Sequence, residues 1–421
     1  MKKVLFLYLI FSCVFFSCKG QNESSEIFEQ VWTNVNNHYF DSNFNGLDWL
    51  EIKTKYAPKV AECKNNESLF SLLNQMLFEL NSSHCGVGLL SDIKNNISPY
   101  IFEKGEIGLD VRVIENQIIV TNVSKNSSAD YANVKTGYRI KKIDGITLNN
   151  IIQNIEYKPP FNDRNKKFHL TTEVLRLIYG EPNTKVKIEF IDEYEKIQTK
   201  ILERTIRKNG IQVGSGLPNA FVESNSYFIS KNIAYLSFNA FLLNNIEEVL
   251  KNLEKVYSSK GLILDLRGND GGSIQAMKML LGRFVSKRLK YGTFINRYEE
   301  NDDYIEPVAP QYKGEIVLLI DEMSISGAEN TAGIFKQLNL GKVIGTHTPG
   351  QLLWGNGYQI NENIVLVIPI YKIEYLTHFN PENNGITPDF EVQLNRQDLL
   401  NNEDSQLSFA INYLNNIINQ Q

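Results

Sequence analysis

The segment 315–336 carries the sequence pattern that most constrains the fold of this chain. The run Ile-Val-Leu-Leu-Ile at 316–320 predicts a buried strand, and a short polar turn then leads into a helix. The same alternation of strand and helix extends over 225–395, with another buried strand near 261–266. We therefore expect an α/β layer whose central strands are largely parallel.

A serine, Ser326, stands where the strand of 316–320 gives way to the helix. The start of a helix offers unpaired N–H groups and the positive end of the helix dipole, and both stabilise a developing oxyanion. The position therefore suits a nucleophilic hydroxyl. Serine is also a preferred helix N-cap, so the same residue could serve only to begin the helix. Ser324, two residues earlier, is the rival nucleophile.

Composition narrows the class of function. The chain has 421 residues, of which 42% are hydrophobic and 22% charged, and its formal net charge is -5. This length predicts two or three domains. A mildly acidic chain without a basic tract gives no reason to expect a nucleic-acid partner. Its cysteines and histidines lack the spacing of a zinc site, and we expect neither a metal nor an organic cofactor.

The N-terminus reads as an export signal. Lys2 and Lys3 precede a short apolar run over 4–16, and Ser17 leads into Cys18. The residues around Cys18 resemble a bacterial lipobox, which predicts a signal peptide over 1–18 and a lipid anchor on Cys18. An ordinary signal peptide, in which Cys18 has no special role, is the alternative. We expect an exported protein held at a bacterial membrane in the cell envelope.

Two further regions precede the α/β layer. Apolar residues at helical spacing over 25–90 predict a helical domain, assigned to 19–95. Residues 98–205 then change to alternating apolar positions with glycine turns, and their order of strands and short helices resembles a PDZ domain. Such domains bind a peptide by adding it as a strand to a sheet edge. The alternative is a small half-barrel without a ligand.

Several segments together carry a resemblance to a peptidase family. They are the glycine-rich turn at 265–272, the Ser-Gly-Ala-Glu run at 326–329 and the turn at 345–350. In this order, behind a PDZ-like segment, they resemble the C-terminal-processing (tail-specific) and tricorn-core serine peptidases. The resemblance implies a core of ClpP/crotonase-like ββα layers over 215–395, followed by a C-terminal helix over 396–421.

The resemblance also bears on the catalytic base. One branch of the family uses a Ser/Lys dyad, but Gln351 occupies the position of that lysine, and an amide cannot take the serine proton. The tricorn-like branch uses a Ser, His, Ser and Glu tetrad instead. The run Ser83-His84 and the segment 382–389 match its motifs. The resemblance therefore implies Ser326 as nucleophile, His84 as base, and Ser83 and Glu382 as its support.

The remaining expectations concern the oxyanion hole and alternative residues. The resemblance implies donors from the turn Gly271-Gly272 and from Gly327, without deciding between the two glycines of the turn. Cys85 lies beside His84 and could be read as a cysteine nucleophile, but no second base is matched to it. Cys63 and Cys85 could pair in an oxidising compartment. Four other histidines read as structural or surface residues: His38, His169, His347 and His378.

We therefore expect a serine endopeptidase that acts on unfolded or short peptide substrates. The alternative is a non-catalytic protein that binds an apolar ligand or a peptide on the same scaffold, because a fold does not guarantee a reaction. Retinoid-carrying proteins share the family fold, and a PDZ-led scaffold with a vestigial core is a second form of this alternative. The pattern leaves the oligomeric state open.

Overall fold

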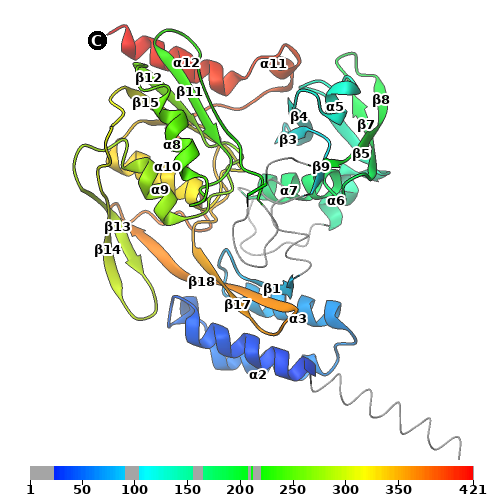
Figure 1. The fold of residues 1–421 in the computed structure, drawn as a ribbon. Coiled ribbons are helices and arrows are strands. Elements are labelled where there is room, and N and C mark those ends of the chain that lie inside the picture. The colour runs from blue at the N-terminus through cyan, green and yellow to red at the C-terminus, as the bar shows by residue number, and fades with distance from the viewer. Residues whose placement is uncertain (1–22, 91–103, 155–164, 207–209, 212–219, 421) are drawn as a thin grey trace, which may run out of the picture.

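The structure is a computed structural model that describes residues 23–90, 104–154, 165–206, 210–211 and 220–420 (Figure 1). The expected signal peptide at 1–18 and the lipidated Cys18 lie outside the described residues. Within these residues no helix has the length and apolarity needed to span a membrane. The described part of the chain also contains no cluster of three or more His, Cys, Asp or Glu residues that could hold a metal ion.

A six-stranded sheet forms the centre of the α/β region. Its strands, in spatial order, are β10 (Ser224–Phe228), β11 (Ile233–Phe238), β12 (Gly261–Asp265), β15 (Glu315–Ile320), β16 (Lys342–Gly345) and β19 (Phe390–Glu391). The pairings from β11 to β19 are all parallel, and β10 joins antiparallel at the edge. The α/β prediction is confirmed, and parallel pairing brings the carboxyl ends of β12, β15 and β16 to one edge of the sheet.

Helices cover both faces of this sheet. Three of them, α8 (Ile246–Glu254), α9 (Ile274–Leu281) and α10 (Gly327–Leu338), share one face, and α12 (Ser405–Ile418) lies on the other (Figure 1). Side chains alternate between the two cores, so that in β15 Leu318 packs with the three helices and Val317 with α12. A strand buried on both faces is continuously apolar, which explains the run at 316–320.

A second sheet connects this core to the N-terminal helices. It contains β1 (Gly86–Leu89), β13 (Leu289–Ile295), β14 (Glu300–Ile305), β17 (Trp354–Gln359) and β18 (Ile364–Tyr375). The helical residues 23–38, the short η1 (Phe44–Gly46), α2 (Trp49–Val60) and α3 (Asn66–Phe78) share one apolar core with β17 and β18. The long strand β18 thus runs from the α/β core to the N-terminal helices (Figure 1).

A third unit has its own sheet and apolar core. The sheet order is β3 (Leu109–Ile114), β4 (Gln117–Val123), β5 (Arg139–Ile143), β7 (Lys185–Ile191) and β8 (Ile197–Glu203). Further elements are β2 (Gly105–Glu106), α5 (Ser128–Tyr131), β6 (Ile146–Thr147), α6 (Leu148–Asn154), α7 (Lys166–Ile178) and β9 (Thr205–Ile206). The core of this unit also takes in Met323, from the turn that precedes Ser326. The unit therefore contacts the segment that leads to the candidate nucleophile.

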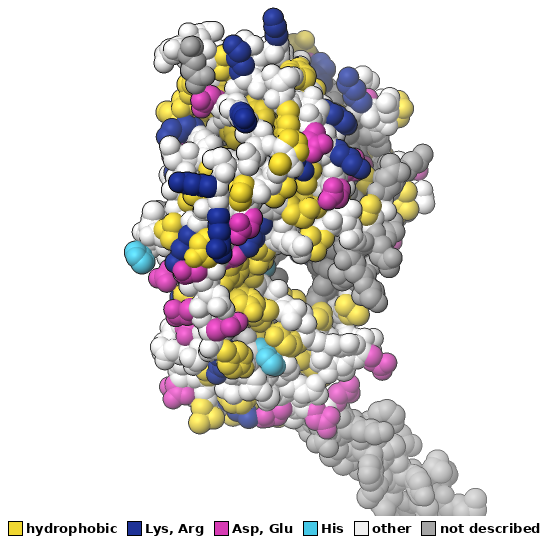
Figure 2. Space-filling view, turned by 60° about the vertical axis from the view of Figure 1, so that its left-hand side comes forward, with side chains coloured by type: hydrophobic (Ala, Val, Ile, Leu, Met, Phe, Trp, Pro, Cys, Tyr) yellow, Lys and Arg dark blue, Asp and Glu magenta, His cyan; other side chains and the backbone are white. Residues whose placement is uncertain are grey.

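The C-terminal segment contacts both the central sheet and the third unit. The short helix α11 (Arg396–Leu400) precedes α12, and its Leu399 packs on β3 and β4 through Ile114 and Ile119. Figure 2 shows charged side chains of both signs spread over one face, with a hollow between the N-terminal helices and the rest of the molecule.

Candidate active site

Ser326 occupies a strained position at the start of α10. Its backbone has φ 53° and ψ -113°, a region that residues other than glycine seldom adopt, and its side chain is 8% exposed. Strain of this kind is retained where the surroundings force it, and it is frequent at active sites. Ser324 is fully buried, and its hydroxyl donates to the Leu266 carbonyl at 2.7 Å. The rival serine therefore has a structural partner and no access to a substrate.

Two backbone N–H groups lie free beside Ser326. A Cβ placed on Gly271 would lie 2.4 Å from the Gly327 nitrogen, so only glycine lets this turn approach the helix start. The Gly271 N–H donates to Asn269 Oδ1 at 2.8 Å, which leaves it unavailable for another acceptor. Within the described residues, no acceptor takes the N–H of Gly272 or of Gly327. Of the three predicted donors, these two are available for an oxyanion.

The predicted base and its supports form one connected group. Ser83 and His84 follow α3, and Glu382 lies in the loop between β18 and β19. Ser83 Oγ lies 2.9 Å from His84 Nδ1 and donates to Glu382 Oε2 at 3.2 Å, while the Ser83 N–H donates to Glu382 Oε1 at 2.8 Å. Residues about 300 positions apart in the sequence are thus joined side by side.

These contacts determine which nitrogen of His84 can act as a base. The Ser83 hydroxyl has a single proton, and it gives this proton to Glu382. The contact at 2.9 Å must then be a donation from His84 Nδ1 to Ser83 Oγ. With the proton on Nδ1, the lone pair is on Nε2, so Nε2 is the nitrogen that can accept the proton of an attacking hydroxyl.

Burial sets the protonation states of this group. It lowers the pKa of His84 to about 4, so the imidazole is neutral at pH 7. Burial also raises the pKa of Glu382, although the Ser83 and Leu352 donors oppose the shift. No hydrogen bond joins the Ser326 hydroxyl to His84 in the described chain. Catalytic hydrogen bonds are often long in the free enzyme and shorten only when substrate binds.

The turn at 348–353 bridges Ser326 and Glu382. The Gln351 carbonyl accepts the Ser326 N–H at 3.1 Å, and the Leu352 N–H donates to Glu382 Oε2 at 3.0 Å. Gln351 thus meets the nucleophile through its backbone, in the position where one branch of similar peptidases carries a basic side chain.

Glu329 is a site residue that the sequence indicated only through its spacing from Ser326. Its carboxylate is fully buried and accepts from Thr348 Oγ1 at 2.6 Å and from the N–H groups of Gly350 and Gln351 at 2.7 and 2.8 Å. Burial raises the pKa of Glu329 to about 7 despite these donors. The Ser-x-x-Glu spacing of a capping box was the available signal.

The other candidate residues lie elsewhere or are inert. His38 stacks on Tyr358, His378 is exposed, and His347 bonds to Asn384 and Thr387. His169 lies in α7. The thiols of Cys63 and Cys85 are free, and burial raises the pKa of both, which disfavours a thiolate.

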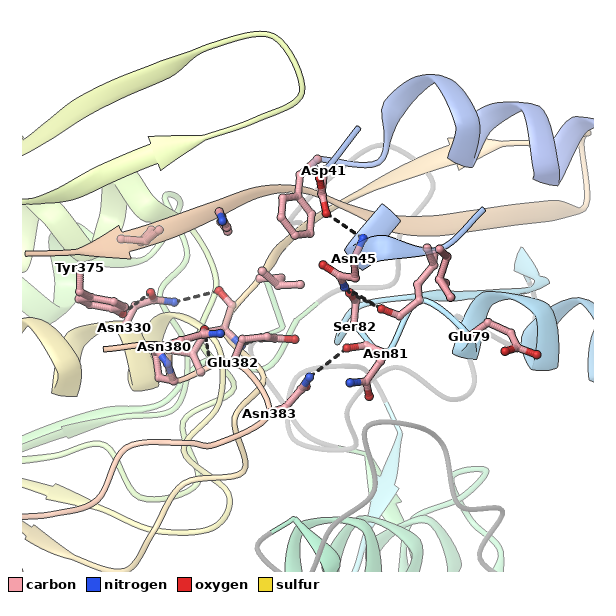
Figure 3. Close-up of a pocket in the computed structure, with 18 residues that line it drawn as sticks. Asp41, Asn45, Glu79, Asn81, Ser82, Asn330, Tyr375, Asn380, Glu382 and Asn383 are labelled. Atoms are coloured by element: carbon pink, nitrogen blue, oxygen red, sulfur yellow. Dashed lines mark hydrogen bonds between the residues drawn. The ribbon is translucent and has the colours of Figure 1, made fainter. Parts of the chain in front are cut away.

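A cavity of about 350 Å³ adjoins this group at the junction of the N-terminal helices and the core. Figure 3 shows Glu382 and Asn383 between Asn330 and Tyr375 on the core side and Asn81 and Ser82 on the other. The Asn383 amide donates across this junction to the Asn81 carbonyl at 2.9 Å. The loop that carries Glu382 is therefore fastened to the segment that carries His84.

Comparisons with known proteins find similar sequences and similar folds. Residues 232–392 match the model of peptidase family S41, and residues 21–78 match the C1 domain of tricorn protease. The chain is 24% identical over 424 residues to the tricorn protease of Thermoplasma acidophilum, covering 93% of this chain and 35% of that protein. It thus spans about a third of the length of that relative.

Shorter relatives match over most of their length. A carboxyl-terminal-processing protease of Synechocystis is 21% identical over 375 residues, covering 88% of this chain and 81% of that protein. Two solved structures share the fold: the photosystem II D1 C-terminal processing protease, at 17% identity with a TM-score of 0.57, and mature CPAF, at 12% with a TM-score of 0.65. They cover 93% of this chain and 97% and 96% of their own.

Proposed function

We propose that this chain is an exported serine endopeptidase of the C-terminal-processing and tricorn family, with Ser326 as nucleophile and His84 as general base. The observation that carries this proposal is the connected group of His84, Ser83 and Glu382, which a buried turn links to Ser326. Its substrates are unfolded or short polypeptides.

The first half of the reaction follows from these positions. Ser326 Oγ attacks the carbonyl carbon of the scissile peptide bond, and His84 Nε2 takes the hydroxyl proton. The carbonyl π electrons move to oxygen, and the N–H groups of Gly272 and Gly327 donate to that oxyanion. Ser83, and through it Glu382, stabilises the imidazolium that forms.

The second half regenerates the enzyme. The imidazolium of His84 gives its proton to the leaving amine as the C–N bond breaks, and an ester on Ser326 remains. Water then attacks the carbonyl carbon of this ester while His84 accepts a proton from it. The bond between that carbon and Ser326 Oγ breaks, His84 returns the proton to Oγ, and the peptide leaves with a new carboxyl group. No step requires a metal or an organic cofactor.

We further propose that the region 98–205, whose described residues begin at 104, is a PDZ-like domain that presents the substrate. The strand β3 pairs only with β4 among the described residues, and we propose that a peptide adds as a strand at its other edge. The helix α7 packs in the same apolar core as β3 and would flank that peptide.

The N-terminal residues 2–18 have the pattern of a lipoprotein signal. We propose that Cys18 carries the lipid and holds the peptidase at the cell envelope. A Cys18→Ser variant should leave the membrane fraction, and unchanged fractionation would contradict the anchor.

Digestion of an unfolded peptide library tests the activity and reports the cleavage preference. We expect cleavage by the chain without its first 18 residues and none by a Ser326→Ala variant, while a folded Ser324→Ala variant retains activity. Equal cleavage by the wild type and Ser326→Ala would contradict the nucleophile. No cleavage by the wild type, with tight binding of an apolar ligand, would favour the non-catalytic alternative.

A further inference from the structure

We propose that Glu329 is a positioning residue that keeps Ser326 in register with the base group through the backbone of 348–353. The proposal rests on the proposed function, since it assigns a role within the same site. Glu329 contacts neither His84 nor the free N–H groups, so its role is to hold other groups in place.

The carboxylate of Glu329 accepts hydrogen bonds both from the turn at 348–351 and from the backbone of Ser326. Its Oε1 accepts from Thr348 Oγ1 and from the Gly350 N–H, at 2.6 and 2.7 Å. Its Oε2 accepts from the Gln351 N–H at 2.8 Å and from the Ser326 N–H at 3.3 Å. One fully buried group therefore fastens the strained serine backbone to the neighbouring turn.

The same turn continues directly into the base group. The N–H groups of Gly350 and Gln351 donate to Glu329, and the next N–H, from Leu352, donates to Glu382. A displacement of the turn from Glu329 therefore shifts the donor that holds Glu382. Because Glu382 accepts both the N–H and the hydroxyl of Ser83, the shift is passed on to His84.

Thr348 supplies a second connection between the two carboxylates. Its hydroxyl donates to Glu329, and its oxygen accepts the N–H of Ile386, in the loop that carries Glu382. The turn at Thr348 and the loop at Gly385 approach closely here. A Cβ on Gly385, at φ 68°, would lie only 1.9 Å from the Thr348 carbonyl oxygen. The two segments therefore move together.

Only a carboxylate suits this position. Its two oxygens accept all four donors, whereas an amide side chain offers one acceptor oxygen and turns its NH₂ against two of them. Gln351 cannot replace this restraint, because its contacts to Ser326 and Glu329 are made by its backbone.

A Glu329→Gln variant tests this role with two independent readouts. Ser259→Ala is the matched control: Ser259 is buried, its hydroxyl bonds to Val256 and Tyr312, and it lies outside the site. We expect Glu329→Gln to lower kcat about 100-fold with little change in KM, because a misplaced group reduces the rate of chemistry more than binding. The control should keep both parameters.

Hydrogen exchange is the readout that does not depend on activity. Mass spectrometry should show faster exchange in Glu329→Gln at the amides of 350–352, including that of Leu352, which Glu329 does not touch. The exchange rate of peptides that contain β12 should be unchanged. If Glu329→Gln is too unstable to purify, Thr348→Val removes one of the four donors and should give the same pattern with a smaller effect.

The outcomes separate this inference from the proposed function. A normal kcat in Glu329→Gln, or a lowered kcat with unchanged exchange at 350–352, would overturn the positioning role. If the wild type cleaves no peptide, the proposed function fails, and exchange at Leu352 still decides whether Glu329 couples the turn to Glu382.

Discussion

Two turns leave the carboxyl end of the central sheet beside Ser326, and the buried carboxylates that they contain or contact, Asp321 and Glu329, are stabilised in opposite ways. After β15, Asp321 pairs with Arg112, from the third unit, at 2.6 Å and also accepts the Gly268 N–H. After β16, the segment 348–351 surrounds Glu329 with a hydroxyl and N–H groups, and no lysine or arginine pairs with it in the described chain.

The difference appears in the protonation of the two groups. Burial alone would raise the pKa of Asp321, but Arg112 and the Gly268 N–H hold it below its ordinary value. Glu329 lacks a cation, and burial raises its pKa to about 7. The first turn therefore carries Asp321, whose charge pair with Arg112 of β3 joins two units, whereas the second turn donates to Glu329 of α10, whose charge responds to pH.

Removing Arg112, the cation that pairs with Asp321 of the first turn, should have the largest effect on stability. An Arg112→Met variant leaves Asp321 buried and unpaired, which lowers the free energy of unfolding by about 3–5 kcal/mol. Denaturant unfolding measures the change, and a further Asp321→Asn substitution should restore part of the loss. Arg288→Met removes an exposed pair with Glu306 and is the control. Equal stability of Arg112→Met and the wild type would contradict the claim that Asp321 of the first turn depends on its cation.

Acid should weaken the second turn and leave the first intact. As the pH falls through about 7, Glu329 gains a proton and can no longer accept all four donors, so kcat/KM should fall several-fold while His84 stays neutral. Below about pH 4, protonated His84 cannot act as a base, and the loss should approach tenfold per pH unit. The lowered pKa of Asp321 keeps the first turn charged over the upper range.

The pH profile of Glu329→Gln tells Glu329 apart from its titratable neighbours. Glu382 and Tyr375 are the groups whose charges interact with it. The step near pH 7 should disappear in this variant, and the step near pH 4 should remain. An unchanged step near pH 7 would assign it to another group.

The smallest expected effect comes from the strand that passes His84. A Cβ on Gly355 of β17 would lie 3.2 Å from His84 Cβ and 3.3 Å from Val367 Cγ1. Gly355→Ala should therefore shift the imidazole by a few tenths of an ångström and lower kcat about threefold, with KM unchanged. Gly357→Ala, two residues along the same strand, meets only an ordinary contact at 3.7 Å and is the control. Equal kcat values for the two variants would show that β17 does not position His84.

Local sequence patterns predicted the α/β layer, because strands buried on both faces are continuously apolar and helices follow them at 3.6-residue spacing. They also predicted that Ser326 begins a helix. The rival Ser324 could not be dismissed from the sequence, since its hydroxyl is occupied by Leu266, 58 positions earlier.

The supports of the site depend on contacts that no local pattern encodes. Ser83 meets Glu382 299 positions later, and these residues were assigned through family motifs alone. Arg112 and Asp321 pair across 209 positions. The role inferred for Glu329 requires β15 and β16 to lie side by side, which brings 348–351 onto the start of α10. Its spacing from Ser326 was visible, but its acceptors were not.

The most direct test of the central claim is the labelling rate with a fluorophosphonate probe, which reacts with an activated serine. We predict rapid labelling of the wild type at Ser326, none in Ser326→Ala, and a rate about 10⁴-fold lower in His84→Ala. His378→Ala, which removes an exposed histidine, should match the wild type. Labelling of Ser326→Ala and His84→Ala at the wild-type rate would contradict the account.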